Sequence, residues 1–233
     1  TFQTDAFLKL LEGNGMLDKN ASVLDVGCGD GKYDIAIADY CGHITGIDLS
    51  SNMIGYANSK ARESGKSNID FLCADWHEFD VEKEGFAKKF DLVFAHMTPA
   101  VQSADTFEKL SLASTGFCVL CKPTRRSDPV SDTIRELIGI KAKKESADQE
   151  MLYAFELLWR QGYLPRIEYE KQVWNLEKTV ESAMGMYINR MKTYRDVTAQ
   201  EEDQMTEYLL SIAEDGIVRE KVNTIKSMLY WHV

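Results

Sequence analysis

The sequence predicts an α/β protein in which a parallel β-sheet is covered by helices. The first half of the 233-residue chain alternates short runs rich in β-branched and aromatic residues with amphipathic helical patterns. Strands separated by helices in this way are typical of a parallel sheet. Three glycines also follow the first predicted strand within five positions, and a helical pattern begins directly after them. Such a loop lets a ligand approach the backbone closely.

The first half supplies the strands and helices in regular alternation. The predicted strands cover residues 22–26, 43–48, 68–74, 90–95 and 116–123. The predicted helices cover residues 4–12, 31–40, 53–64 and about 100–112. Ser50 or Ser51 precedes the third of these helices, and either hydroxyl can cap its first free N–H groups.

The pattern changes in the second half of the chain. Residues 124–147 are polar and charged, and they predict a loop or a short helix. A helix follows over residues 151–163, with Gly162 as its stop. One face of this helix is apolar and consists of Met151, Leu152, Ala154, Phe155, Leu158 and Trp159. Alternating polar and apolar residues then predict strands over 166–174 and 224–233.

Two amphipathic helices lie between these last two strands. Their apolar faces consist of Val180, Ala183, Met184, Tyr187 and Met191 in one helix, and Met205, Tyr208, Leu209 and Ile212 in the other. Together they make a connection of roughly forty residues, more than a hairpin uses. We therefore expect a helical cap over residues 176–216, inserted into a main domain formed by residues 1–175 and 217–233.

Composition excludes several classes of partner. A formal net charge of -10 disfavours nucleic acid and anionic membranes as partners. No apolar run reaches the length of a membrane span, and no signal-peptide pattern opens the chain. The five cysteines include a CxxC at Cys118 and Cys121, but that spacing places the two thiols on opposite faces of a strand. We interpret the cysteines as reduced thiols of a cytoplasmic protein, and the four scattered histidines predict no metal site.

The glycine loop is Gly27, Gly29 and Gly31, a GxGxG at the end of the first strand. The helix behind it points free N–H groups and a partial positive charge at the loop. The dinucleotide fingerprint requires a glycine where Lys32 stands. Asp25 lies two residues before the first glycine. Its negative charge would repel an anionic pyrophosphate but is compatible with a cationic ligand. The loop therefore favours a nucleotide-like cofactor other than NAD, and a plain tight turn is the alternative.

Two further acids end the next two strands. Asp48 can accept hydrogen bonds from both hydroxyls of a ribose lying across the strand ends, and its alternative role is a helix cap. Asp75 can accept from an adenine amino group, and Trp76 offers apolar surface beside the ring. Acids at three successive strand ends therefore predict a nucleoside site.

The motifs "VLDVGCGDG", "GIDLSSNM", "FLCADW" and "FDLVFA", in this order and spacing, resemble those of the class I S-adenosylmethionine-dependent methyltransferases. The segment "LLWRQGYLPRIEY" is similar to the helix-to-strand junction that these enzymes place after their fifth strand. The resemblance covers about residues 21–175. It implies a doubly wound, mostly parallel, seven-stranded sheet of the Rossmann-like methyltransferase fold, with an antiparallel last strand inserted between strands five and six.

The resemblance also implies roles for the site residues. Asp25 and the glycine loop would hold the methionine part of the cofactor, Asp48 its ribose, and Asp75 with Trp76 its adenine. The remaining cofactor-binding residues expected are Cys28, Leu49, Met53, Ala95 and His96. No covalent enzyme intermediate is needed, because methyl transfer is a direct displacement promoted by alignment of the reacting atoms.

The acceptor side of the site is predicted more coarsely. The segment "HMTPAV" follows the fourth strand and should face the transferred methyl group. Histidine side chains ordinarily titrate near neutrality, so His96 is the candidate general base, although it can equally pack on the cofactor or bond a backbone group. The candidate substrate-pocket residues are Thr98, Met184, Tyr187 and Met191, and the last three can equally belong to a core.

The sequence therefore predicts a cytoplasmic S-adenosylmethionine-dependent methyltransferase that acts on a small molecule, yields S-adenosylhomocysteine and uses no metal. We expect no nucleic acid or membrane partner, and a monomer or homodimer. One alternative is an NAD(P)-dependent oxidoreductase, which Lys32 and Asp75 oppose. Another is a domain that binds S-adenosylmethionine without transfer, as a sensor or assembly partner. A protein or RNA methyltransferase would need a recognition domain or a basic stripe.

Overall fold

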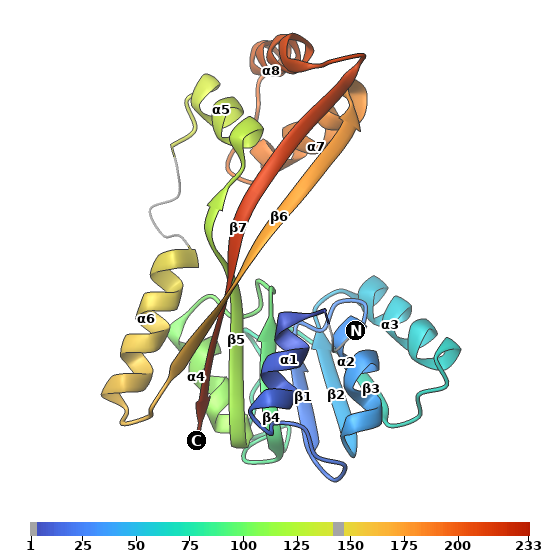
Figure 1. Cartoon of the computed structure of the whole chain (residues 1–233), viewed down its shortest axis with the longest axis vertical. Coiled ribbons are helices and arrows are strands. Elements are labelled where there is room, and N and C mark those ends of the chain that lie inside the picture. The colour runs from blue at the N-terminus through green and yellow to red at the C-terminus, as the bar shows by residue number, and fades with distance from the viewer. Residues whose placement is uncertain (1–3, 142–146) are drawn as a thin grey trace. The chain divides into compact units, whose positions relative to one another are not determined.

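The computed structural model describes residues 4–141 and 147–233, and its seven strands form one sheet in the order β3-β2-β1-β4-β5-β7-β6 (Figure 1). The strands are β1 Ser22–Val26, β2 His43–Asp48, β3 Ile69–Cys73, β4 Phe90–His96, β5 Ser114–Ser127, β6 Arg166–Thr179 and β7 Ile217–His232. The helices are α1 Ala6–Gly13, α2 Lys32–Ile37, α3 Ser51–Glu63, α4 Ala104–Ala113, α5 Pro129–Leu137, α6 Ala147–Arg160, α7 Val180–Lys192 and α8 Ala199–Ile212, with a 3-10 turn η1 Ala38–Tyr40.

The sheet confirms the predicted fold class. Strands β1 to β5 pair in parallel. The N–H of Val233, which follows the end of β7, donates to Gly116 near the start of β5. The end of β7 therefore lies beside the beginning of β5, so these neighbouring strands run in opposite directions. The last strand is inserted between the fifth and the sixth, as the resemblance implies.

The chain divides into two compact units, and strands β5, β6 and β7 contribute residues to both. The first comprises the described residues of Thr1–Lys122, Gln149–Glu170 and Ser227–Val233. The second comprises the described residues of Pro123–Asp148 and Lys171–Lys226. The second unit contains the whole of the predicted cap, residues 176–216, together with α5 and the adjoining parts of the three strands.

Strands β1 and β4, in the middle of the sheet of the first unit, are buried on both faces, as parallel strands covered by helices are, whereas the edge strand β3 is partly exposed. In β4, Leu92 and Phe94 pack against α1 and α2. The intervening Val93 and Ala95 belong to the opposite cluster, which includes side chains of α4 and α6. The period of two also separates the CxxC pair, because Cys118 lies in the second of these clusters and Cys121 in the first.

Polar side chains cap the N-terminal ends of helices α1 and α3. Ser50 is the N-cap of α3, and its hydroxyl accepts from the N–H of Met53 at 3.3 Å. Asp5 caps α1 by accepting from the N–H groups of Phe7 and Leu8. These side chains replace the intrahelical partners that the first N–H groups of a helix lack.

Three predicted elements end elsewhere in the structure. Strand β5 runs on to Ser127, β6 runs on to Thr179, and β7 begins at Ile217. Charged residues interrupt the apolar pattern in these extensions, so the sequence predicts strands that are too short. The predicted helix over residues 31–40 is α2 followed by the 3-10 turn η1. Of the segment 124–147, residues 142–146 lie outside the described residues.

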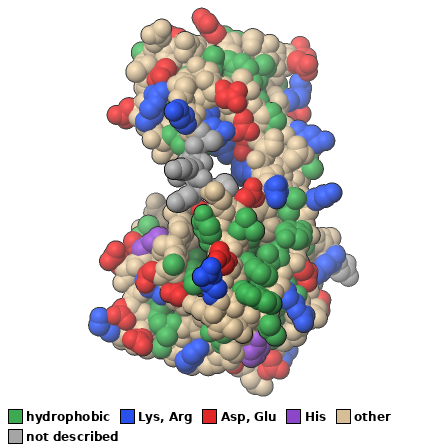
Figure 2. Space-filling view, turned by 90° about the vertical axis from the view of Figure 1, so that its left-hand side faces the viewer, with side chains coloured by type: hydrophobic (Ala, Val, Ile, Leu, Met, Phe, Trp, Pro, Cys, Tyr) green, Lys and Arg blue, Asp and Glu red, His purple; other side chains and the backbone are tan. Residues whose placement is uncertain are grey.

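The predicted buried face of α6 is partly wrong. Met151, Ala154 and Leu158 are buried, but Leu152 and Trp159 are 67% and 61% exposed. The two residues lie on a neighbouring stripe of the helix that faces away from the core. Figure 2 views the molecule from the side on which α6 lies in Figure 1, and it shows hydrophobic side chains gathered on that face of the first unit.

The second unit has its own core, built by α5, α7 and α8 with residues of β7. Its buried side chains are Val130, Ile134, Ile138, Ile140, Ala183, Tyr187, Met191, Met205, Leu209 and Val218. Glu220 of β7 is buried among them and accepts from the N–H of Val130 at 2.8 Å and from the hydroxyl of Tyr187 at 2.6 Å. This carboxylate therefore satisfies the start of α5.

Candidate cofactor site

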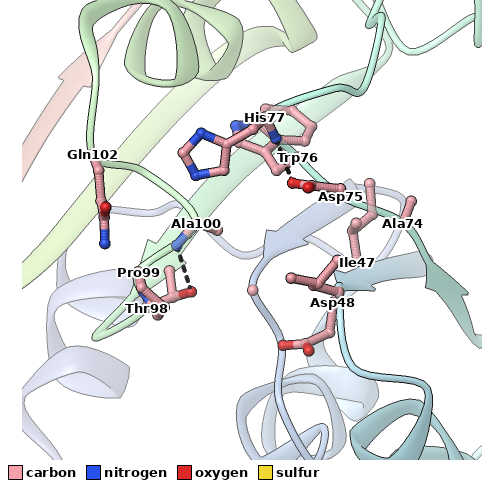
Figure 3. Close-up of a pocket in the computed structure, with 12 residues that line it drawn as sticks. Ile47, Asp48, Ala74, Asp75, Trp76, His77, Thr98, Pro99, Ala100 and Gln102 are labelled. Carbon is pink, nitrogen blue, oxygen red and sulfur yellow. Dashed lines mark hydrogen bonds between the residues drawn. The ribbon is translucent and has the colours of Figure 1, made fainter. Parts of the chain in front are cut away.

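A cavity of about 270 Å³ lies at the carboxyl ends of β1 to β4 in the first unit (Figure 3). Six of its lining residues are predicted site residues, namely Gly27, Asp48, Leu49, Asp75, Trp76 and Thr98. The other six are Ile47, Ala74, His77, Pro99, Ala100 and Gln102. Each of these six adjoins a predicted residue in the sequence or follows it closely. Their positions could have been inferred because they lie at the strand ends, but these residues do not form a sequence motif that indicates a binding site.

The glycine loop requires its glycines. Gly27, Gly29 and Gly31 have φ of 77°, 56° and 72°, in the left-handed region that other residues rarely adopt. A Cβ on Gly27 would lie 2.0 Å from Oγ1 of Thr98. The N–H groups of Gly27 and Cys28 donate to the carbonyl of Ile47 at 2.7 and 3.0 Å. The loop is therefore held against β2 while Thr98 packs directly on its first glycine.

Asp48 ties this loop to the next helix. Its Oδ2 accepts from the N–H of Gly29 at 2.9 Å, and its Oδ1 accepts from the N–H of Ser50 at 2.8 Å. A carboxylate has about four acceptor positions, so two such bonds leave capacity for ligand hydroxyls. The N-cap of α3 is Ser50, so the helix-cap role considered as the alternative for Asp48 is filled by Ser50.

Asp75 and Trp76 line the cavity just after the end of β3. Oδ1 of Asp75 accepts from the N–H of His77 at 2.9 Å, which turns the chain after β3 (Figure 3). Trp76 is only 2% exposed, donates its Nε1–H to the carbonyl of Thr106 at 2.9 Å and stacks on Phe79. Trp76 is therefore fixed in the core, and only a small part of it can meet a ligand.

Asp25 and Asp34 form a buried acidic pair behind the loop, and sequence reasoning missed Asp34. The two residues are 2% and 0% exposed. Burial is the main cause that raises the pKa of both carboxyls: that of Asp34 rises to about 7, and that of Asp25 lies well above its usual range. An aspartate inside the apolar stretch "YDIAIA" is the sequence signal that could have found it.

This pair predicts a stability that falls as the pH rises. Unfolded Asp34 ionises near its ordinary pKa of 3.8, whereas folded Asp34 keeps its proton until about pH 7. The folded state therefore binds more protons between these values, and its free energy of unfolding decreases across that window. Asp34→Asn, which cannot ionise, should reduce this decrease in urea titrations at pH 5 and pH 7.5. An identical pH dependence in the variant and the unsubstituted protein would contradict the assignment.

The remaining predicted residues lie around the cavity without lining it. Met53 is 43% exposed on α3, Cys28 is buried in the loop, and Ala95 is fully buried in β4. The ring of His96 packs 4.8 Å from that of Phe7 and 4.2 Å from that of Tyr33, between centroids. The role of His96 as a general base stays a prediction.

The three predicted pocket residues of the cap lie in the second unit. Tyr187 and Met191 are 1% and 0% exposed and belong to its core. Met184 packs against the same cluster and accepts a weak hydrogen bond from Thr206 at 3.7 Å. Their contribution to a substrate pocket stays a prediction.

Lys122 anchors the loop that carries Thr98 and Gln102. This lysine is 5% exposed, and its ammonium group donates to the carbonyls of Thr98 and Val101 and pairs with Glu150 at 3.1 Å. A buried ammonium needs such partners, so the loop and the lysine hold each other in place. No sequence pattern indicated this contact, because the two segments meet only in the folded sheet.

Lys122→Met should loosen the loop. The change removes the donor of two carbonyls and the partner of Glu150, and hydrogen bonds to charged groups are worth about 1.5 to 3 kcal/mol. We expect amide exchange in peptides covering residues 97–102 to become about tenfold faster, measured by mass spectrometry. Lys122→Arg should restore most of the protection. Equal exchange in Lys122→Met and the unsubstituted protein would exclude the anchoring role.

The comparisons with known proteins identify the family. The model of the methyltransferase domain family matches residues 17–215, most of the chain, so the chain belongs to that family. A curated relative, the ubiquinone biosynthesis O-methyltransferase of Aromatoleum aromaticum, is 38% identical over 82 residues, 33% of this chain and 33% of the relative. The match therefore spans about a third of that protein's length.

Solved structures share the fold. The YcgJ protein of Bacillus subtilis superposes with a TM-score of 0.58 at 19% identity and covers 96% of each chain. A methyltransferase of Geobacter sulfurreducens, solved in complex with S-adenosyl-L-homocysteine, gives 0.50 at 18% identity and covers 94% of this chain and 88% of its own. The predicted family is thus confirmed, and the comparisons do not support the oxidoreductase alternative.

The described part of the chain holds neither a membrane-spanning helix nor a cluster of metal-ligating side chains. Within residues 4–141 and 147–233, no helix is both long and apolar enough to cross a membrane. The same part of the chain brings no three His, Cys, Asp or Glu side chains together in a way that could hold a metal ion. All five cysteines lie in the described part and are free thiols.

Proposed function

We propose that the protein is an S-adenosylmethionine-dependent methyltransferase that methylates a nucleophilic atom of a small molecule by direct displacement. The observation that carries this proposal is one cavity bounded by the left-handed glycine loop, Asp48 and Asp75 at the carboxyl ends of successive parallel strands. Ligands of open α/β sheets bind at that edge. Membership of the methyltransferase domain family supports the same activity.

The residues present fit the parts of this cofactor. Asp48, already held by two backbone N–H groups, would accept from the ribose hydroxyls. Asp75, which lines the same cavity after β3, would accept from the adenine amino group. The glycine loop and Asp25 would hold the amino acid end, because Oδ1 of Asp25 is buried with no donor in place. The bound cofactor supplies a methyl group activated by a sulfonium centre.

The protein's own contribution would be alignment and exclusion of water. Thr98, Pro99, Ala100 and Gln102 line the cavity on the side after β4, where the acceptor would approach. The amide of Gln102 could orient an acceptor by hydrogen bonding. Positioning of this kind can be worth roughly 7 to 11 kcal/mol of the barrier in favourable cases. His96 remains the proposed base for an acceptor that must lose a proton.

The proposed methyl acceptor is a small molecule. The relatives' names include quinone methyltransferases, but the matched segments cover only about a third of each protein. The net charge of -10 supports a small molecule over nucleic acid. The free thiols support a cytoplasmic location. We propose a monomer or homodimer that uses no metal.

Calorimetric titration of the full chain tests the cofactor directly. S-adenosylmethionine, S-adenosylhomocysteine and NAD would be titrated in parallel. We expect micromolar dissociation constants for the first two and no heat from NAD. Binding of NAD alone would overturn the proposed function while leaving the fold unchanged. Binding of the first two without turnover against a broad set of small nucleophiles would favour the sensor alternative.

A further inference from the structure

Two carboxyl groups face each other beneath the glycine loop. Asp25 lies next to last in β1, and Asp34 lies in the first turn of α2, so the loop connects the two elements. Asp25 is 2% exposed and Asp34 is completely buried. Burying two acids together costs stability, because both lose their hydration.

The pair lacks donors for most of its oxygens. Oδ1 of Asp25 and both oxygens of Asp34 are buried with no hydrogen-bond donor in place. The two carboxyls are polar partners of each other, and the backbone N–H of Asp34 also acts on its own carboxyl. Two ionised carboxylates cannot hydrogen-bond to each other, because both only accept. The contact therefore requires that the two groups share a proton, as adjacent carboxyls in a dry site do.

The surrounding titratable groups are also acids. The charge of Asp48 in β2 raises the pKa of Asp25, and that of Asp30 in the glycine loop raises the pKa of Asp34. The thiol of Cys28 interacts electrostatically with both carboxyls, and that of Cys41 with Asp34. Burial raises the pKa of both thiols, so they are neutral. Asp48 is balanced by two backbone N–H groups, and Asp30 pairs with Lys60. The charge that best complements the pair is thus a cation arriving from outside.

We propose that Asp25 and Asp34 form a proton-sharing pair that releases its proton when the α-ammonium group of the cofactor binds at the glycine loop. The inference rests on the proposed function, which supplies the ligand. Asp25 accepts a hydrogen bond from the ammonium group, the O–H bond of the shared proton breaks, and a water molecule of the solvent takes up the proton. Asp34 acts through Asp25 and is a positioning residue.

The direction of the pH dependence follows from mass action. If binding releases one proton, a higher pH favours the complex, and the dissociation constant falls up to tenfold per pH unit while the pair is protonated. The pKa of Asp34, raised to about 7 by burial, places the upper end of this dependence near neutrality. Above that range the affinity should level off.

The experiment is calorimetric titration with S-adenosylhomocysteine between pH 6 and pH 8. Each pH is measured in two buffers with different heats of ionisation, so that the number of protons released is obtained directly. We expect close to one proton at pH 6 and an affinity about fivefold higher at pH 7 than at pH 6, because a group with a pKa of about 7 is half ionised at pH 7. 5′-Methylthioadenosine, which lacks the amino acid end, should bind without proton release.

Two variants separate positioning from structure. Asp34→Asn keeps the size of the side chain and can donate to an ionised Asp25, so it should bind S-adenosylhomocysteine with no proton release and little pH dependence. Asp39 lies in the adjoining 3-10 turn η1, where its exposed carboxylate pairs with Lys66. Asp39→Asn should release protons and bind S-adenosylhomocysteine as the unsubstituted protein does.

The outcomes are distinct. Binding of S-adenosylhomocysteine without proton release in the unsubstituted protein would overturn the inference and leave the proposed function intact. Equal release by Asp34→Asn and the unsubstituted protein would also overturn it. Absence of binding at every pH would instead refute the proposed function. If Asp34→Asn does not fold, the comparison of the two ligands on the unsubstituted protein decides.

Discussion

Gly27→Ala should lower the free energy of unfolding of the first unit by about 2 to 4 kcal/mol. The φ of 77° at this position is unfavourable for any residue with a Cβ. The added carbon would also lie 2.0 Å from Oγ1 and 2.6 Å from Cβ of Thr98. Thr98 cannot easily withdraw, because its Oγ1 accepts from the N–H of Ala100 and its carbonyl accepts from the ammonium group of Lys122. Urea denaturation measures the difference.

Gly29→Ala is the matched control for this change. Gly29 has a φ of 56°, yet a Cβ there would meet nothing within 4 Å. Only the backbone cost of about 1 to 2 kcal/mol should therefore appear. Equal losses in the two variants would show that the contact between Gly27 and Thr98 adds nothing. A smaller loss for Gly29→Ala would establish that the close approach of the two loops is specific to Gly27.

Asp48→Ala should weaken the binding of S-adenosylhomocysteine by about 1 to 3 kcal/mol, roughly five- to 150-fold. The change removes the proposed acceptor of the ribose hydroxyls. It also leaves the N–H groups of Gly29 and Ser50 without their partner, so the glycine loop loses its tie to α3. Calorimetric titration at one fixed pH gives the affinity directly.

Asp70→Ala provides the control for the loss of one negative charge. Asp70 lies on β3 with its side chain 79% exposed and pairs with His43 at the surface. Its removal should leave the affinity within about twofold, because exposed ion pairs contribute little. If Asp48→Ala binds as tightly as Asp70→Ala, Asp48 does not belong to the cofactor site.

Much of the first unit could be predicted from local patterns. The strands at residues 22–26 and 43–48 begin and end in the structure where the sequence places them, since apolar runs bounded by glycine and polar residues define buried strands. Ser50 caps α3 because its hydroxyl can reach the N–H of Met53. The sheet order came from the resemblance of the motifs, because local patterns do not specify which strands become neighbours.

Other features escaped prediction because they depend on partners distant in the chain. The extensions of β5, β6 and β7 are strands despite their charged residues, since neighbouring strands satisfy their backbone groups. Leu152 and Trp159 share an apolar helical stripe, but the core contacts the stripe formed by Met151, Ala154 and Leu158. A helical pattern shows that apolar residues lie together, and it does not show which side meets the core.

The sequence by itself determined the sheet class, the glycine loop and the acids at three strand ends, because each depends on residues within a few positions of one another. The tertiary structure alone decided that Asp34 faces Asp25, that Lys122 holds the loop after β4 and that Thr98 packs on Gly27. The contacts of Lys122 and Thr98 join segments that approach only when the parallel strands align, and Asp34 approaches Asp25 when α2 packs against β1. Hydrogen bonding and burial then act between residues whose separation along the chain carries no information about their distance.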